Sequence, residues 1–242
     1  MFTDIHNHCI YGVDDGAHRF ESTQELLTEA VGDGIHAIIS TPHVTPGQER
    51  FPQDIYDRHL QKAREWLQSQ NMDITIYVGA EILYTPHTAP MLQDGRITTM
   101  AGTKNVLIEF SPDDKYEQLL EAATAVGNAG YQPIFAHIER YMALTKLDQL
   151  YELQEDYNVR LQVNARTLLK KPGLFRKKYI YGMFKEGLID FVASDTHHME
   201  GRRTCMTQGF EALSSIAGKA AAEKLMIENP NRLLTEKYFA HS

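Results

Sequence analysis

The sequence of 242 residues contains only two cysteines, Cys9 and Cys205, and no long uninterrupted apolar run. Two cysteines are too few for a disulfide framework, so we expect free thiols. No window approaches the roughly 18 consecutive apolar residues that a membrane span requires. The first residues also lack the basic and apolar regions of a secretory signal. These absences predict a cytoplasmic protein without membrane insertion.

Positive charge is also scarce, since 24 Lys and Arg residues stand against 32 Asp and Glu residues and give a formal net charge of -8. Nucleic-acid backbones are held mainly by clustered Lys and Arg, so we expect no nucleic-acid partner. A phosphorylated substrate is still compatible with this charge, because bound divalent cations would reverse the sign locally at a site.

Short apolar segments alternate with longer segments of helical period, which is typical of βα units and a parallel sheet. No linker-like or low-complexity segment interrupts the alternation, so we predict a single α/β domain over residues 1–242. The expected strands are 2–6, 36–41, 73–80, 105–110, 131–137, 159–164 and 190–194. The expected helices are 21–33, 54–70, 114–129, 143–157 and 173–187, followed by 204–217 and 219–228. The stretches 41–52 and 84–104 break the pattern and are predicted to be loops over a site.

Side chains that can bind metals stand at the ends of six of these seven strands. Parallel barrels build their active sites at the C-terminal ends of their strands, so we expect these side chains to converge. The candidates are His6, His8, Asp15, His43, Glu81, Glu109, His137, Asp195 and His197. Residues i and i+2 of a strand point to the same side, so His6 and His8 can bind one ion together.

Each candidate also has a structural interpretation when it is taken alone. A histidine near a strand end is often simply hydrogen-bonded, and an acid after a strand often caps a helix or forms a turn. We keep the structural interpretation for five other histidines: His18, His36, His59, His87 and His241. Independent structural residues have no reason to gather at one end of a barrel, and this favours a metal site for the nine candidates.

Mixed imidazole and carboxylate ligands without thiolates suit Mn, Fe or Zn. Eight or nine ligands are too many for one ion, so we expect two or three ions with a bridging carboxylate. Such clusters hydrolyse phosphate esters by activating water and by clamping the transferring group.

The motifs "DIHNHCIYGVDDGA", "STPH", "GAE", "IEF", "AHIERY" and "ASDTHHMEGR" occur in this order along essentially the whole chain. Together they resemble the PHP (polymerase and histidinol phosphatase) superfamily, and within it the bacterial protein-tyrosine phosphatases of capsule and exopolysaccharide loci. The resemblance implies a distorted (β/α)7 barrel that holds three divalent ions, commonly manganese.

The resemblance also implies how the ligands are shared among the ions. His6 and His8 would bind the first ion with Glu81 and Asp195, and Glu81 would bridge to a second ion held by Glu109 and His137. The third ion would be held by Asp15, His43 and His197. Asp14 is left over, and we expect it to orient a ligand by a hydrogen bond or to shape its loop.

Two arginines are implied to hold the substrate phosphate: Arg140, in "AHIERY", and Arg202, after the last metal motif. A planar guanidinium can engage two phosphate oxygens at once. An ion pair with Glu139 is the alternative for Arg140, and Arg203 adjoins Arg202, so either could face the site. Together with two of the candidate metal ligands, Asp195 and His137, these two arginines, Arg140 and Arg202, make up the predicted catalytic residues.

The C-x5-R loop of cysteine-dependent phosphatases is absent around both Cys9 and Cys205, so a metal-activated water is the expected nucleophile. The resemblance implies that the substrate is phosphotyrosine in the tail of a bacterial tyrosine kinase. Two alternatives stay open: a small-molecule phosphatase such as a histidinol-phosphate phosphatase, and a catalytically silent metal-binding regulator. Whether the chain forms a homo-oligomer is also open.

Overall fold

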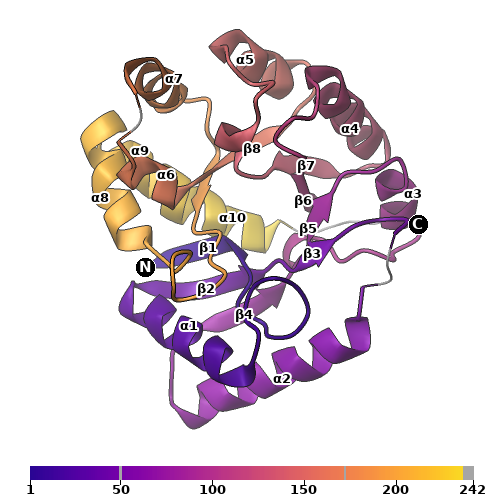
Figure 1. Ribbon diagram of the computed structural model, residues 1–242, viewed down its shortest axis with the longest axis vertical. Coiled ribbons are helices and arrows are strands. Elements are labelled where there is room, and N and C mark those ends of the chain that lie inside the picture. The colour runs from indigo at the N-terminus through magenta and orange to yellow at the C-terminus, as the bar shows by residue number, and fades with distance from the viewer. Residues whose placement is uncertain (49–50, 172, 237–242) are drawn as a thin grey trace.

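A ring of parallel strands surrounds the centre of the molecule, with helices outside it (Figure 1). The computed structural model describes residues 1–48, 51–171 and 173–236. The strands in these ranges are β1 (Phe2–Asn7), β2 (Ile35–Ser40), β3 (His43–Val44), β4 (Thr75–Val78), β5 (Glu81–Leu83), β6 (Asn105–Glu109), β7 (Gln132–Phe135), β8 (Arg160–Asn164) and β9 (Phe191–Ala193).

Two parallel sheets make up the ring. One has the order β1-β2-β4 and the other the order β3-β5-β6-β7-β8-β9. They meet where the Glu81 amide donates to the Pro42 carbonyl at 3.1 Å. On the other side the ring closes beyond β9, where the His8 amide donates to the Thr196 carbonyl at 2.8 Å. Since β2 with β3 and β4 with β5 each act as one interrupted strand, this is the distorted seven-stranded α/β barrel that the sequence predicts.

The strand predicted at 73–80 is wrong in its bounds. β4 covers Thr75–Val78 only, and pairing resumes in β5 at Glu81, against β6. The break is at Gly79, where an added Cβ would lie 2.8 Å from the Ile39 Cγ2 atom of β2. The chain passes too close to β2 at this position for any larger residue. It then enters the second sheet as β5, whose first residue is Glu81.

The helices cover the outside of the ring (Figure 1). They are α1 (Phe20–Gly32), α2 (Gln53–Ser69), α3 (Thr88–Gln93), α4 (Tyr116–Asn128), α5 (Leu147–Glu155), α6 (Ala165–Leu169), α7 (Leu174–Lys185), α8 (Met206–Ala217), α9 (Lys219–Glu223) and α10 (Asn229–Thr235), with the 3-10 turns η1 (Met100–Gly102) and η2 (Ile138–Arg140) and the π-helical turn η3 (Lys224–Glu228).

The helices predicted between the strands are present, with ends shifted by one to four residues. Each buries one stripe of its surface, as in α2, where Tyr56, Leu60, Ala63 and Leu67 face the core at spacings of four, three and four. The predicted helix at 219–228 is α9 continued by η3. α3, α6 and α10 were not predicted, because five to seven residues are too few to show a helical period.

A small apolar cluster fills the interior of the barrel. Its strand members are Ile5, Ile39, Leu107, Ile134, Phe191 and Ala193. Ala136, Met100 of η1 and Leu233 of α10 complete it, and α10 lies behind the ring in Figure 1. The Thr3 hydroxyl donates to the Asn231 side-chain oxygen at 2.6 Å, which ties α10 to the start of β1. This end of the barrel is therefore closed, and the opposite end carries polar side chains.

A bulge in β1 helps to position the first histidines. Between Asp4 and Asn7 the strand has one residue more than β2 in the paired register. Ile5 already faces the barrel interior, so strict alternation would turn His6 toward the helices. The extra residue changes the direction in which the following side chains point, as bulges commonly do. His6 therefore faces the barrel interior as well.

No helix in the described parts of the chain is long and apolar enough to cross a membrane. Cys9 and Cys205 are both buried free thiols, which confirms the expectation of no disulfide.

Candidate metal centre

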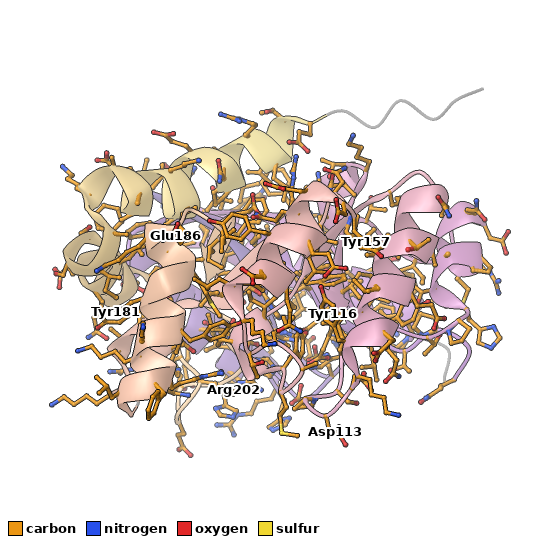
Figure 2. All side chains as sticks on the ribbon, turned by 90° about the horizontal axis from the view of Figure 1, so that it is seen from above. Asp113, Tyr116, Tyr157, Tyr181, Glu186 and Arg202 are labelled. Carbon is orange, nitrogen blue, oxygen red and sulfur yellow. The ribbon has the colours of Figure 1, made fainter. Side chains whose placement is uncertain are left out.

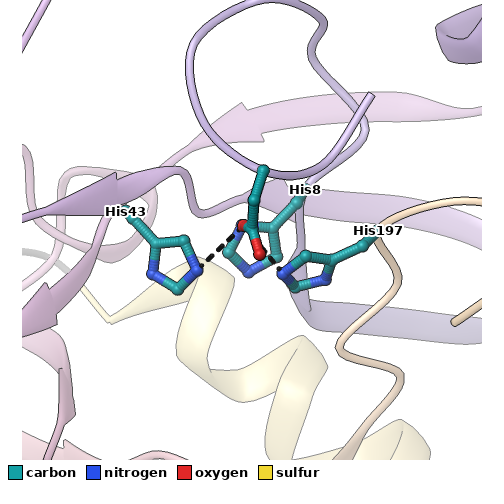
Figure 3. Close-up of side chains that lie close together, drawn as sticks. His8, His43 and His197 are labelled. Atoms are coloured by element: carbon teal, nitrogen blue, oxygen red, sulfur yellow. Dashed lines mark ion pairs between the residues drawn. The ribbon is translucent and has the colours of Figure 1, made fainter. Parts of the chain in front are cut away.

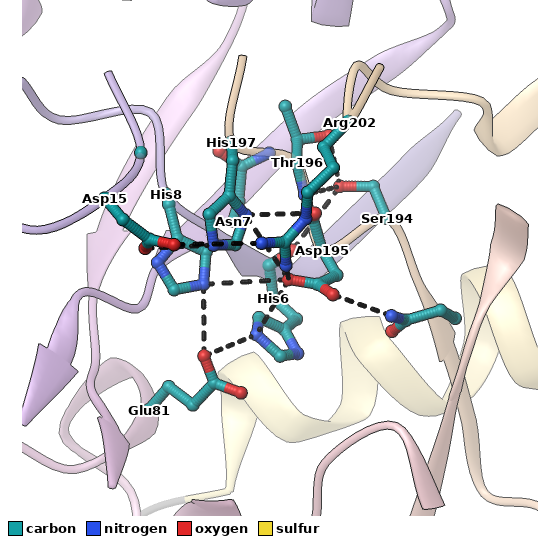
Figure 4. Close-up of polar contacts among 12 residues, drawn as sticks. His6, Asn7, His8, Asp15, Glu81, Ser194, Asp195, Thr196, His197 and Arg202 are labelled. Carbon is teal, nitrogen blue, oxygen red and sulfur yellow. Dashed lines mark hydrogen bonds and ion pairs between the residues drawn. The ribbon is translucent and has the colours of Figure 1, made fainter. Parts of the chain in front are cut away.

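His6 and His8 leave the end of β1 side by side and meet the carboxylate of Glu81. The Nε2 atoms of His6 and His8 lie 3.0 Å and 3.2 Å from Glu81 Oε2. All three side chains are buried, and their ligand atoms lie within 4.8 Å of one another. Asp195 Oδ1 lies 3.5 Å from His6 Nε2, so four predicted ligands surround one small space (Figure 4).

Glu81 also faces the ligands at the ends of β6 and β7. Its Oε1 atom lies 2.8 Å from His137 Nε2, and Glu109 Oε1 lies 3.3 Å from the same nitrogen. His43 Nδ1 lies 3.2 Å from Glu81 Oε2 and 3.4 Å from Glu109 Oε2. Glu81 thus has one oxygen on each side of the cluster, as a bridging carboxylate requires.

A third group of ligands lies on the open side of the cluster. The ligand atoms of His8, Asp15, His43 and His197 lie within 4.8 Å of one another. Asp15 Oδ1 is 3.2 Å from His43 Nε2 and 3.3 Å from His197 Nε2. Figure 3 shows the imidazoles of His8, His43 and His197 close together. Asp15 is the exposed member of the group, since 64% of its side chain is accessible.

In three of these histidines, the Nδ1 atom contacts an oxygen that can only accept a hydrogen bond, and this contact fixes the tautomer. His6 Nδ1 contacts Gln162 Oε1 at 3.2 Å, and His8 Nδ1 contacts Asp14 Oδ2 at 2.7 Å. His197 Nδ1 contacts the Asp195 carbonyl at 3.2 Å. Each Nδ1 must therefore donate, and each Nε2 is free to bind a metal.

The Nε2 atoms of His6, His8 and His197 and the Oε2 atom of Glu81 are buried without a hydrogen-bond partner in the structure. The Nε2 atoms of His6 and His8 lie 3.0 Å and 3.2 Å from Glu81 Oε2, and His197 Nε2 lies 3.3 Å from Asp15 Oδ1, but none of these contacts has hydrogen-bond geometry. Buried polar atoms are rarely left without a partner, and four that face one another suit a cation between them. The residues present therefore fit a bound metal.

Asp14 supports the loop that carries Asp15. In addition to holding His8, its carboxylate accepts from the Gly16 amide at 2.9 Å and from the His43 amide at 3.3 Å. The structure thus shows both of the contacts expected for Asp14, one to a ligand and one within the loop. An added Cβ at Gly16 would lie 2.3 Å from the His8 carbonyl, so the loop folds tightly against β1.

Two ligands have backbones that non-glycine residues rarely adopt. His137 has φ 31° and Asp195 has φ 54°, and each stands two residues after the end of a strand. Left-handed conformations of this kind cost about 1–3 kcal/mol and cluster at functional sites. The strain here turns both side chains from the barrel wall into the cluster.

The electrostatics of the cluster are those of a cation site. Burial opposes ionisation of Glu81, but the imidazoles of His6 and His137 outweigh it and hold the Glu81 pKa well below its usual value. Burial also opposes ionisation of Glu109, but hydrogen bonds to His137 and His43 lower its pKa to about 2. Despite burial, Glu109 and Glu81 raise the pKa of His137 to about 9. Glu81 and Glu109 are therefore ionised near neutral pH, and without metal His137 carries a proton.

Both predicted arginines reach the cluster through Asp195. Arg140 donates to Asp195 Oδ2 at 2.6 Å. Arg202 donates to Asp195 Oδ1 at 2.7 Å (Figure 4). Arg203 instead lies 3.6 Å from Glu29, so Arg202 is the one that faces the site. Arg140 does not pair with Glu139, whose Oε1 atom accepts from the Asn164 amide at 3.1 Å.

Residues of β8 take part that the sequence did not single out. Gln162 Oε1 accepts from both His6 and the His137 amide, and Asn164 donates to Asp195 Oδ2 at 2.7 Å. Their signal was the alternation of polar residues with Leu161 and Val163, which indicates an inward-facing polar row. Their neutral amides are not typical metal ligands, so the pattern did not mark them as part of a metal site.

Asp4 was also missed. It is fully buried on β1, and it accepts from the Ser194 amide at 2.9 Å and from the Ser194 hydroxyl at 2.5 Å. Asp4 therefore fixes the segment that presents Asp195. Its place inside a predicted strand gave no sign of this contact with a residue 190 positions away.

The structure keeps the other histidines apart from the cluster. Among the described residues, His18, His36, His59 and His87 belong to none of the three ligand groups. His59 donates to the Tyr11 carbonyl at 2.8 Å and stacks on the Tyr11 ring, which is a structural role. His241 lies outside the described residues.

An α/β barrel whose strand ends bring imidazoles, carboxylates and two guanidinium groups together defines the class of metal-dependent hydrolases. The family model "Capsular polysaccharide synthesis, CpsB/CapC" matches residues 2–235. The chain belongs to this family.

Similar proteins agree with this assignment. Tyrosine-protein phosphatase CpsB of Streptococcus pneumoniae is 30% identical over 240 residues, which cover 97% of this chain and 98% of that protein. A solved structure with the same fold comes from the crystal structures of YwqE from Bacillus subtilis and CpsB from Streptococcus pneumoniae, which are described as unique metal-dependent tyrosine phosphatases. It matches with a TM-score of 0.84 and 26% identity, and the match covers 98% of this chain and 96% of that chain. Histidinol phosphate phosphatase of Lactococcus lactis shares the fold, with a TM-score of 0.52, 15% identity and 79% and 84% coverage.

Proposed function

We propose that this chain is a metal-dependent protein-tyrosine phosphatase that acts in capsular or exopolysaccharide synthesis. The strongest support within the molecule is that nine imidazole and carboxylate ligands and two arginines meet at one end of the barrel. The family membership and the tyrosine phosphatases among its relatives support the same activity.

Three divalent ions would make the cluster positive overall. The four carboxylates Asp15, Glu81, Glu109 and Asp195 contribute -4 and three divalent ions would contribute +6, so the loaded site would carry +2 before the arginines are counted. A site of this sign attracts a phosphate dianion, although the whole chain is acidic.

The resemblance of the motifs supports one way of sharing the ligands, and the contacts are compatible with it. His6, His8, Glu81 and Asp195 would hold a first ion, Glu81 would also reach a second with Glu109 and His137, and Asp15, His43 and His197 would hold a third. The ligand atoms include no thiolate, which suits manganese, with iron or zinc as alternatives. His43 also lies 3.2 Å from Glu81, so its imidazole would lie between the second and the third metal ion.

Bound divalent ions would supply the charge that lowers the pKa of coordinated water and stabilises the phosphoryl group. The chain itself supplies the orientation of the substrate. Arg140 and Arg202 have 38% and 32% of their side chains accessible, and each donates to Asp195 through one guanidinium nitrogen. Each guanidinium has further N–H groups that can bind phosphate oxygens while Asp195 holds it in place.

The cysteines do not fit a nucleophilic role. Cys9 is 1% exposed, and burial raises its thiol pKa well above the usual value. Burial raises the pKa of Cys205 to about 11. A thiolate is the reactive form of cysteine, and neither residue would hold one near neutral pH.

We further propose that the physiological substrate is phosphotyrosine in the tail of a bacterial tyrosine kinase, as the resemblance of the motifs implies. A flexible tail suits a site that opens at the ends of the strands, where Asp15 is exposed. A small-molecule phosphatase and a catalytically silent regulator are the competing functions.

The test is a substrate panel on protein stripped with a chelator and then reloaded with Mn. Phosphate release is measured from a phosphotyrosyl peptide and from histidinol phosphate. We expect turnover of the peptide only in the reloaded protein. Preference for histidinol phosphate would support the small-molecule phosphatase. No turnover of either substrate with metal bound would support the silent regulator.

A further inference from the structure

A cavity of about 550 Å³ adjoins the metal centre, and its walls are basic. Six cations line it: Arg140, Arg166, Lys170, Lys171, Arg176 and Arg202. Two carboxylates, Glu139 and Asp195, are the acids among the lining residues. Because Asp195, Arg140 and Arg202 belong to the metal centre as well, the cavity is continuous with the place where phosphate would bind.

Neither carboxylate neutralises the outer part of the cavity. Asp195 is bound by Arg140 and Arg202 at the inner end. Glu139 is 5% exposed, and its Oε1 atom accepts from the Asn164 amide and from the Thr167 hydroxyl. Among the described residues, no carboxylate lies within ion-pair distance of Lys170, Lys171 or Arg176. The outer cations are therefore free to bind an external anion.

The charge here is local and opposite to that of the chain. Six of the 24 Lys and Arg residues fall within positions 166–178, and that segment contains no Asp or Glu. Figure 2 shows that α7 runs from Glu186 past Tyr181 toward the end of the molecule that carries Arg202. Arg176, in the first turn of α7, thus lies at the same end as the metal centre.

Two exposed apolar residues precede Arg176 in the first turn of α7. Phe175 is 90% exposed and Leu174 is 79% exposed. Large apolar side chains exposed in this way often mark a binding surface. An exposed aromatic residue in the same helical turn as a cavity cation suits a ligand that is itself both aromatic and anionic.

We propose that this cavity is a subsite for a second anionic group on the peptide substrate, next to the phosphotyrosine that is hydrolysed. This inference rests on the proposed phosphatase function and specifies its substrate class. The second group is either an acidic residue or another phosphotyrosine. Phosphotyrosine fits better, because it carries about -1.5 to -2 charge and an aromatic ring, whereas a carboxylate carries -1 and no ring.

The test compares three synthetic peptides with the Mn-loaded full chain in solution. One has a single phosphotyrosine with neutral neighbours, the second has aspartates beside it, and the third has a second phosphotyrosine. We expect kcat/KM to rise from the first peptide to the third, and the advantage of the anionic peptides to shrink as salt is added. Equal kcat/KM for all three would overturn the proposal.

Paired variants locate the effect. Lys170→Gln with Arg176→Gln removes two cavity cations, and we expect the preference for the doubly phosphorylated peptide to fall about tenfold. Lys177→Gln with Lys178→Gln removes the same charge from exposed positions that do not line the cavity, and this pair should keep the preference. An equal fall in both pairs would show a general charge effect and would reject the subsite.

Three other results would be decisive. If the cavity pair keeps the peptide preference but loses binding to phosphatidylserine vesicles, the segment is a membrane contact and the proposal is wrong. Turnover of the neutral peptide without any preference would reject the subsite alone. Failure to hydrolyse every phosphotyrosyl peptide would reject the proposed function together with the subsite.

Discussion

At the scale of single residues, the metal centre depends on neighbours that set which nitrogen of each imidazole is free. Asp14 and Gln162 hold the Nδ1 atoms of His8 and His6, and both leave Nε2 directed at Glu81. Such outer partners fix the ring and raise its basicity, so they matter almost as much as the ligands.

Asp14→Asn should therefore weaken metal binding by about 10- to 100-fold, because a neutral amide replaces the charged acceptor of His8. Manganese affinity is measured by competition with a chelating dye, and activity should return at high Mn concentration. Asp113→Asn is the matched control, since Asp113 is exposed at the same end of the molecule (Figure 2). Unchanged affinity in Asp14→Asn would contradict the role given to Asp14.

Cys9→Ser and Cys205→Ser should each keep kcat within about twofold, since metal-activated water does not need a thiolate. Steady-state hydrolysis of a phosphotyrosyl peptide by the two Mn-loaded variants tests this. Complete loss of activity in either folded variant would point to a cysteine nucleophile instead.

At the scale of elements, the sequence predicted strand ends well and the shape of the strands poorly. The seven strands could be recognised in the sequence because each is buried and therefore consists mainly of apolar residues. The bulge at Asp4–Asn7 and the break at Gly79 depend on neighbours from β2, such as Ile39, which lie far away in the sequence. The alternation in β8 indicates that Gln162 faces inward, but its contact with His6 could not be predicted, because the two residues are 156 positions apart in the sequence.

The loop after β1 gives an element-scale prediction. In Gly16→Ala the new Cβ would collide with the His8 carbonyl, so we expect a loss of about 1–3 kcal/mol in stability and weaker binding at the third position, which includes Asp15. Gly32→Ala is the control. It lies in the last turn of α1 with no atom within 4 Å of the new Cβ, and it should gain about 0.5–1 kcal/mol.

Chemical denaturation and Mn titration of both glycine variants provide the measurement. If Gly16→Ala matched wild type in stability and in metal affinity, the tight packing of this loop against β1 would have no part in the site.

At the scale of the whole molecule, the barrel brings together buried charges that a cation must balance. Without metal, burial opposes protonation of His8, but Asp14 and Glu81 raise its pKa to about 10, and the pKa of His137 is raised to about 9. Both groups hold a proton at pH 7 that a metal must displace.

Metal affinity should therefore rise with pH between 6 and 8, by up to about tenfold per pH unit for each proton released. The sign follows because both pKa values lie above this range, so raising the pH lowers the concentration of the competing proton. Calorimetric titration with Mn in two buffers of different ionisation enthalpy counts the protons. Binding without proton release would show that these histidines are already neutral.

The central claim is that the cluster at the strand ends both binds the metal and hydrolyses phosphotyrosine. It is tested most directly by measuring metal content and phosphate release together, for wild type, His137→Ala and His59→Ala, with each variant confirmed as folded. We predict that His137→Ala loses metal and at least about 100-fold in kcat/KM, whereas His59→Ala, whose histidine is structural, keeps both. Full activity in chelator-stripped wild type, or in metal-depleted His137→Ala, would contradict this account.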